Sequence, residues 1–168
     1  PEDILNYTIT NPAVNSSYTN APLEITDKVS TGKLTEKEGN KYLFKIGALI
    51  GNHSSLYYEK KRVLPVDLNN PINMNRTITI NIPKGYRIMN ARDLTMHAYY
   101  VNREVKPVVS FNSEYTIKKD RKHGDKLIVT VTESYPKMHF EAGEYEHFRN
   151  VVNTAADFSK VTLLLSKG

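Results

Sequence analysis

The densest group of candidate metal ligands in this sequence lies where an expected strand meets an expected helix. His139 and Glu141 alternate along the strand, so their side chains share one face. Glu144 and His147 are spaced to share one face of the helix. Imidazole and carboxylate groups are ligands that zinc accepts. Because no His-x-x-x-His spacing accompanies them, we interpret the four as surface residues and expect no bound metal or other cofactor.

The sequence contains no motif that is typical of a catalytic nucleophile or of a phosphate-binding loop. The 168 residues include no cysteine, which excludes thiolate nucleophiles and metal sites built from cysteine. Serine, aspartate and five histidines are present, but no Gly-x-Ser-x-Gly elbow positions a serine for attack. Four glycines are isolated turn residues rather than a phosphate-binding loop: Gly32, Gly39, Gly85 and Gly124. We therefore predict no catalytic residues and no enzymatic activity in this chain.

Two tyrosine pairs are the candidate binding residues. The chain contains eleven tyrosines and no tryptophan, and Tyr57-Tyr58 and Tyr99-Tyr100 are adjacent. Neighbouring residues of a strand face opposite ways, so one ring of each pair should lie in the core and the other on the surface. Exposed rings would contact a protein partner. A carbohydrate-binding β-sandwich that stacks sugars on these rings is the alternative function.

The charge of the chain is unevenly distributed. The formal net charge is +5, yet residues 1–27 contain four acidic residues and no lysine or arginine. The densest basic runs are residues 60–62 and 118–123. Basic surfaces with nearby tyrosines can bind nucleic acid, but such runs are more often solvated turns, and we favour the second interpretation. No apolar run approaches the roughly 20 residues of a membrane span, so we expect none.

Alternating apolar residues predict strands along most of the chain. Early examples are Leu5–Ile9 and Leu23–Lys28, and the clearest is Thr77–Ile82, whose isoleucines would face a core. Turn signals that recur about every 8–12 residues are typical of a β-sandwich.

Hairpins are expected at two places. Gly39-Asn40 would join arms at Val29–Thr35 and Lys41–Leu49, and His123-Gly124-Asp125 would join Glu114–Lys118 to Lys126–Glu133. Val105–Phe111 is expected as a separate strand. Gly47 and Gly51 bracket the end of the second arm, and a glycine within a strand pattern indicates a bulge or a close approach of another backbone.

One helix is predicted near the end of the chain. Tyr145, Phe148, Val152 and Ala155 follow the spacing of one helical face, and the expected strand Val161–Leu165 comes shortly after. A helix so closely linked to a strand must lie against the end or edge of the sheet that the strand joins. The predicted fold is all-β: a two-sheet antiparallel β-sandwich with one C-terminal helix packed at its end before the last strand.

Three segments resemble a known family when they are taken in order. They are Tyr58–Val66 with its Arg-x-x-Pro, Ile80–Tyr86 with Ile-Pro-x-Gly-Tyr, and Glu144–Phe158 with Glu-Tyr-x-x-Phe-Arg. Together they resemble the C-terminal region of large Bacteroidetes-type transglutaminase-like proteins, which combine a β-domain, a transglutaminase- or cysteine-protease-like core and a C-terminal β-domain of unknown function. The family's catalytic Cys-His-Asp belongs to the core, and no position here matches its cysteine.

The resemblance covers roughly residues 40–167. It implies that residues 40–168 form an accessory β-sandwich domain that docks on, or orients, an upstream catalytic core of the same polypeptide. Residues 1–39 would be N-terminal strands or a linker, and whether they belong to the same sandwich stays open, as does the oligomeric state. The chain does not begin with methionine, so we expect it to be cut from a longer protein. Because such relatives are usually exported, the expected location is the periplasm or the cell surface.

Overall fold

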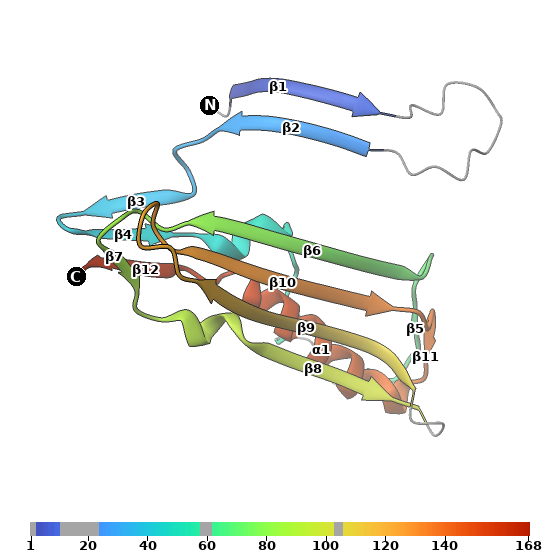
Figure 1. Ribbon diagram of the computed structural model, residues 1–168. Coiled ribbons are helices and arrows are strands. Elements are labelled where there is room, and N and C mark those ends of the chain that lie inside the picture. The colour runs from blue at the N-terminus through green and yellow to red at the C-terminus, as the bar shows by residue number, and fades with distance from the viewer. Residues whose placement is uncertain (1–2, 11–23, 58–61, 103–105) are drawn as a thin grey trace. The chain divides into compact units, whose positions relative to one another are not determined.

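The computed structural model describes residues 3–10, 24–57, 62–102 and 106–168 (Figure 1). The chain divides into two compact units, residues 1–36 and 37–168.

The first unit contains one antiparallel strand pair. β1 (Asp3–Thr10) pairs with β2 (Glu24–Ser30), and Tyr7 lies opposite Asp27. These strands occupy the two segments in which alternation predicted them. The side chains of Ile25 and Val29 on β2 are exposed.

A four-stranded antiparallel sheet organises the second unit. Its strand order is β6 (Ile72–Asn81), β10 (Lys126–Tyr135), β9 (Pro107–Lys118) and β8 (Met96–Val101). Alternation places apolar side chains on one face and polar side chains on the other. Along β10, Leu127 and Val129 are fully buried, whereas the side chain of Thr130 is exposed. The buried face of this sheet forms the core of the unit.

Helix α1 (Tyr145–Phe158) covers the buried face and packs against β8 and β9 (Figure 1). A turn of 3₁₀-helix, η3 (Ala142–Glu144), leads into it. Ring centroids lie 5.7 Å apart between Phe158 and Phe111 of β9, and 6.2 Å apart between Phe148 and Tyr135 of β10. The aromatic residues therefore join the helix to the sheet. The predicted helix is confirmed, but it covers the face of the β6–β10–β9–β8 sheet, whereas the expectation placed it at the end or edge of the sheet that β12 joins.

The remaining strands form a second four-stranded sheet and a short pair. The sheet is ordered β3 (Thr35–Glu38), β4 (Lys41–Phe44), β12 (Leu163–Lys167) and β7 (Tyr86–Ile88), and the pair joins β5 (Val66–Asp67) to β11 (His139–Phe140). All pairings are antiparallel, and no sheet in the described part of the chain closes into a barrel. Antiparallel sheets with one helix before the last strand confirm the predicted fold class.

Two boundaries differ from the sequence expectation. The first hairpin is β3–β4, with Gly39 at φ +58°, and residues 46–50 form a 3₁₀-helix, η1 (Ile46–Ile50), instead of continuing a strand. The two strands expected on either side of Asn112 are one continuous strand, β9. Ser113 explains this continuity, because its hydroxyl donates to the carbonyl of Leu94 at 2.7 Å, which satisfies a polar side chain on the buried face. A second 3₁₀-helix, η2 (Ala91–Leu94), ends at that carbonyl.

Candidate interaction surface

A segment between β4 and β5 runs antiparallel to helix α1. We call residues 46–66 the strap; the structure describes 46–57 and 62–66 of it. At its start the backbone N–H of Gly47 donates to the carbonyl of Val161, 2.9 Å away, just beyond the helix. At its end Val66 pairs with Phe140, just before the helix. The strap therefore follows the helix from its C-terminal end to its N-terminal end.

Gly47 fits where no other residue can. A Cβ atom built on it would lie 2.1 Å from the carbonyl oxygen of Phe158 and 2.6 Å from that of Ser159. Such distances are well inside van der Waals contact, so any side chain must push the two backbones apart. Of the two alternatives that the sequence left for Gly47, a bulge or a close backbone approach, the structure shows the second, whereas a Cβ atom on Gly51 would meet nothing within 4 Å.

Polar groups of the helix hold the middle of the strap. The side-chain oxygen of Asn153 accepts a hydrogen bond of 2.6 Å from the backbone N–H of Leu56, and Asn153 is only 6% exposed. One turn further along the helix, the carboxylate of Asp157 accepts a hydrogen bond from the hydroxyl of Tyr57. That hydrogen bond raises the pKa of Tyr57 above its ordinary value.

Arg62 and Arg149 lie beside the same aromatic ring. The guanidinium of Arg62 is 5.7 Å from the ring centroid of Tyr145, and that of Arg149 is 5.9 Å from it. Both distances suit cation–π attraction. The ring of Tyr145 is buried, so this contact fixes the strap next to the first turn of α1.

A buried carboxylate ties the strap to the sheet. Glu133 of β10 is 4% exposed and takes an inward position of the strand pattern. It accepts hydrogen bonds from the hydroxyl of Tyr135 at 3.0 Å and from Arg76 of β6 at 3.2 Å. The Nε2 atom of His53 lies 3.1 Å from it, and the Nδ1 atom of His53 lies 3.1 Å from the carbonyl of Gly51. Both ring nitrogens of His53 therefore face acceptor oxygens.

This buried polar cluster acts as a structural link. Both carboxylate oxygens of Glu133 already accept hydrogen bonds. Burial, together with the neighbouring charge of Glu133, raises the pKa of Tyr135, which keeps its hydroxyl protonated as a donor. Glu133 occupies an inward position of an alternating strand. A charged residue at such a position could have indicated this buried cluster from the sequence alone. His53, which lies 80 positions from Glu133, carried no such signal.

The outer side of the strap is apolar and exposed. Val63 is 85% exposed and Leu64 is 68% exposed, although both are large apolar residues. Tyr57 and Leu49 are also exposed, at 53% and 42%. We call these four side chains the strap surface. In the described part of the chain they are four of the ten exposed large apolar side chains, so one segment supplies a large share of them.

The four candidate metal ligands take part in other contacts. His139 lies between two carboxylates, with Nδ1 2.6 Å from Asp67 and Nε2 3.1 Å from Glu141. The hydrogen bond to Asp67, and then that to Glu141, raises the pKa of His139. Among the residues that the structure describes, no three histidine or acidic side chains are arranged to hold a metal ion.

Glu144 and His147 lie around Tyr100 instead. The carboxylate of Glu144 accepts hydrogen bonds from Lys137 at 2.5 Å and from the hydroxyl of Tyr100 at 3.2 Å. The ring of His147 stacks on that of Tyr100 with centroids 4.4 Å apart. Glu141 and Glu144 also form a capping box at the start of η3, which explains why two acids stand at this corner.

The candidate tyrosines are only partly grouped. On β8, Tyr99 is 68% exposed and Tyr100 is half-buried on the opposite face, as alternation predicted. Tyr57 belongs to the strap, and Tyr58 lies outside the described residues. Tyr57 and Tyr99 are the only exposed tyrosines among the described side chains. They belong to different elements, so this part of the chain contains no row of exposed rings for sugar stacking.

Comparisons with known proteins found one similar solved structure. No curated protein matches this chain. The crystal structure of a "putative protease" from Parabacteroides distasonis is similar to it, with 21% sequence identity and a TM-score of 0.45. The match covers 63% of this chain and 19% of the other, so the chain spans about a fifth of that protein.

The described residues include no helix that is long and apolar enough to cross a membrane.

A family model covers three-quarters of the chain. It matches residues 40–165, which lie within the second compact unit. Those residues include the strap, helix α1 and the four-stranded sheet that both of them cover. The chain therefore belongs to the family described as "Domain of Unknown Function with solved-structure structure (DUF3858)".

Proposed function

We propose that residues 37–168 form a non-catalytic interaction domain that packs through the strap surface against the catalytic core of a larger transglutaminase-like protein. The observation that carries this proposal is the exposure of Val63 and Leu64 in a segment that is anchored on both sides. Arg62 precedes them and lies on the ring of Tyr145, and Val66 follows them in the β5–β11 pair.

Two of the three motifs that resemble the transglutaminase-like proteins meet at this place. Arg62 begins the Arg-x-x-Pro motif, and Tyr145 and Arg149 belong to Glu-Tyr-x-x-Phe-Arg. Their contact leaves the two middle residues of the first motif, Val63 and Leu64, facing solvent. A conformation that is fixed before binding lowers the entropy lost on association. This arrangement supports a surface that is prepared for a partner.

The apolar character of the strap surface favours a protein partner. Burying Val63 and Leu64 would contribute up to about 1.5–3 kcal/mol each, because most of both side chains is exposed now. Interfaces between domains of one chain are commonly modest in area, so two such anchors would supply much of the affinity. The non-catalytic part of the proposal is supported by the lack of cysteine and by the engagement of both oxygens of Glu133.

The test is a titration of the full chain into the separately produced catalytic core. In the Val63→Asp/Leu64→Asp variant two apolar anchors are replaced by charges, and we expect binding to weaken by about 100-fold or more. The matched control is Ile25→Asp/Met89→Asp, which replaces two exposed apolar side chains (56% and 62%) outside the strap. Calorimetry measures both affinities, and thermal melts check that both variants fold.

The control should bind like the unmodified chain. If the unmodified chain does not bind the core, or if both double variants weaken binding equally, the strap surface is not the docking surface.

A further inference from the structure

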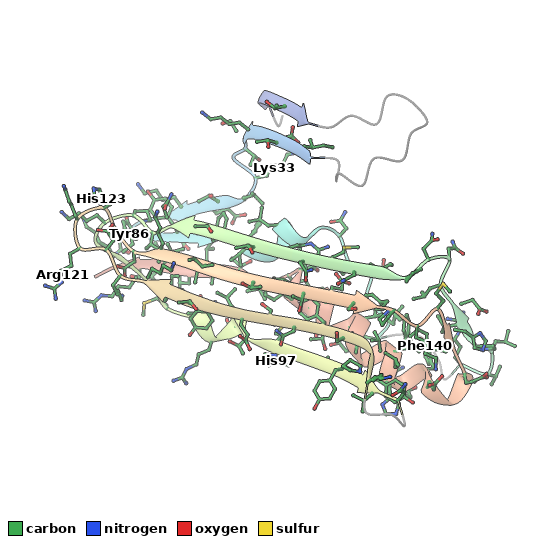
Figure 2. All side chains as sticks on the ribbon, turned by 45° about the vertical axis from the view of Figure 1, so that its right-hand side comes forward. Lys33, Tyr86, His97, Arg121, His123 and Phe140 are labelled. Carbon is green, nitrogen blue, oxygen red and sulfur yellow. The ribbon has the colours of Figure 1, made fainter. Side chains whose placement is uncertain are left out.

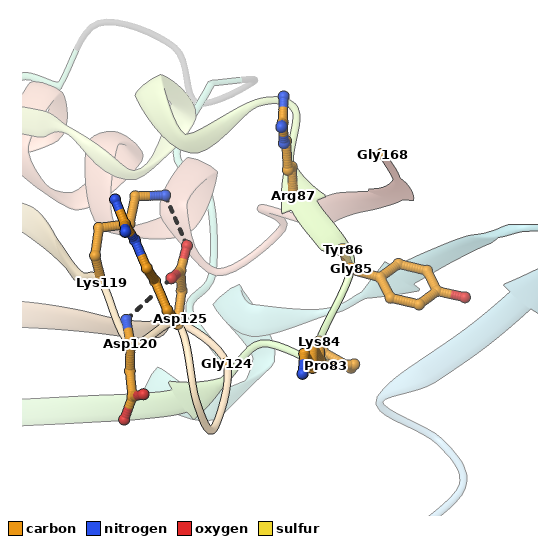
Figure 3. A pocket seen from close by; sticks show the side chains of 11 residues that line it. Pro83, Lys84, Gly85, Tyr86, Arg87, Lys119, Asp120, Gly124, Asp125 and Gly168 are labelled. Carbon is orange, nitrogen blue, oxygen red and sulfur yellow. Dashed lines mark hydrogen bonds and ion pairs between the residues drawn. The ribbon is translucent and has the colours of Figure 1, made fainter.

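A pocket of about 560 Å³ opens at one end of the second unit, where two turns meet (Figure 3). One wall is the turn between β6 and β7, residues 83–87, which contains most of the Ile-Pro-x-Gly-Tyr motif. The other wall is the tip of the β9–β10 hairpin, and Gly168 completes the lining. The strap surface contributes none of the lining residues, so the pocket is a second site within the same unit.

Backbone hydrogen bonds fix the two walls against each other. The N–H of Ile82 donates to the carbonyl of Asp125 at 2.8 Å, and the N–H of Gly168 donates to that of Gly85 at 2.9 Å. Gly124 has φ +95°, and a Cβ there would lie 2.5 Å from the carbonyl oxygen of Ile82. The glycine thus allows the hairpin tip to touch the turn. The pocket has a defined shape because its walls are held by backbone contacts.

The acidic residues of the pocket are occupied by the hairpin. Asp120 accepts hydrogen bonds of 2.9 Å from the backbone N–H groups of Lys122 and His123. Asp125 accepts hydrogen bonds from the ammonium of Lys119 at 2.6 Å and from the backbone of Asp120 at 3.2 Å. Both carboxylates therefore stabilise the turn, and one of the four cations that line the pocket is paired with one of them.

Three cations remain for a ligand. Lys84, Arg87 and Arg121 line the pocket, are exposed, and make no ion pair with any described residue. Figure 3 shows Lys84 and Arg87 across the pocket from the Lys119–Asp125 pair. Like charges that line one concave surface reinforce each other's field and attract anions. Six of the eleven residues that line the pocket are charged, which suits a polar ligand.

We propose that this pocket binds small oxyanions that carry two or more negative charges, as phosphate or carboxylate groups. The guanidinium groups of Arg87 and Arg121 can each donate two parallel hydrogen bonds to such a group, and Lys84 adds a point charge. The volume falls in the range of small-molecule sites and exceeds the space that one phosphate needs. A ligand with two anionic groups would reach cations on both walls. This inference does not depend on the docking role of the strap.

Two probes distinguish the two kinds of anionic group. Pyrophosphate carries phosphate groups and citrate carries carboxylates, and each is titrated into the full chain by calorimetry at low ionic strength. We expect saturable binding of one molecule per chain by at least one probe, and weaker binding as salt is added. The probe that binds more tightly identifies the kind of group. A titration in which neither probe gives saturable heat would overturn the proposal.

Charge-matched variants separate the pocket from the general basic character of the chain. Arg87→Gln/Arg121→Gln should weaken binding of the preferred probe by at least about tenfold. Lys28→Gln/Arg92→Gln removes the same charge outside the pocket and should change the affinity less than about twofold. Lys84→Gln should give a smaller loss than the double arginine variant. Equal losses in the two double variants would show non-specific attraction to a basic protein, which contradicts the proposal.

Discussion

The strap and the tip of the β9–β10 hairpin both hold side chains toward solvent, but the contacts that position them differ in burial. Under the strap lie Glu133 and Asn153, which are 4% and 6% exposed. At the hairpin tip, the side chains of Asp120 and Asp125 are 40% and 24% exposed. Polar contacts that are buried are costly to break, whereas exposed ones can be replaced by water. Substitutions beneath the strap should therefore destabilise the whole unit, and substitutions at the hairpin tip should change only the local structure.

The same comparison applies to the two proposed sites. The strap surface is apolar, and its position depends on contacts with the core of the unit. Figure 2 shows Arg121, one of the cations of the pocket, at the outer end of the β9–β10 hairpin. The pocket is cationic, and its position depends on backbone hydrogen bonds between two turns. A protein partner would thus be recognised through buried area and an anion through charge. Salt should separate them, because it weakens the binding of an anion more than apolar docking.

The largest effect should come from Glu133→Ala. Removing the carboxylate leaves Arg76, His53 and Tyr135 without their common acceptor, so we expect a loss of about 2–4 kcal/mol in the free energy of unfolding. Urea denaturation measures it. Glu133→Gln keeps the shape but removes the charge and should lose less.

The matched control is Glu114→Ala, on the exposed face of β9 in the same sheet. It should change the free energy of unfolding by less than about 0.5 kcal/mol. If Glu133→Ala and Glu114→Ala unfold at the same urea concentration, the buried cluster does not hold the strap to the sheet.

A smaller loss is expected from Gly47→Ala. The new methyl group would overlap the carbonyl oxygens of Phe158 and Ser159, and relieving this overlap should cost about 1–3 kcal/mol. Gly143→Ala provides the control, since a Cβ there would meet nothing within 4 Å. We expect Gly143→Ala to melt close to the unmodified chain. Equal melting temperatures for the two variants would show that the strap can move away from the helix at little cost.

The regular elements could be predicted because their signals are local. The helix was found from the spacing of Tyr145 and Phe148, and β10 from the alternation of Leu127, Val129 and Val131. Gly47 was also informative, since a glycine in an apolar segment indicates that another backbone passes close by.

The strap and the pocket could not be predicted because they depend on contacts between distant segments. Leu56 and Asn153 are 97 positions apart, and neither follows a periodic pattern that would link them. The two turns around the pocket were each recognised as turns. The two turns lie next to each other because β6 pairs with β10, and this pairing could not be predicted from the sequence. The acidic corner around Glu144 was interpreted as surface residues, but its capping box was not recognised, because a capping box and a metal site both place carboxylates near a helix start.

The smallest effect should appear at the hairpin tip as the pH is lowered. Hydrogen bonds from His123 hold the pKa of Asp120 below its ordinary value, and the bond from Lys119 does the same for the pKa of Asp125. A carboxyl group whose pKa is lower in the folded state stabilises that state above its unfolded pKa of about 3.8–3.9, and this contribution is lost as the pH falls through the folded pKa. We expect the hairpin tip to loosen at acidic pH while the sheet remains intact.

Amide signals in NMR spectra can follow this change residue by residue. The amides of Lys122 and His123, which donate to Asp120, should lose protection as the pH falls below about 4, and those in the middle of β10 should not. Asp120→Asn keeps an acceptor oxygen but cannot titrate, so it should remove most of the pH dependence of these two amides. If the tip and the centre of β10 lose protection together, the hairpin tip belongs to the same cooperative unit as the contacts beneath the strap, and the distinction between the two regions fails.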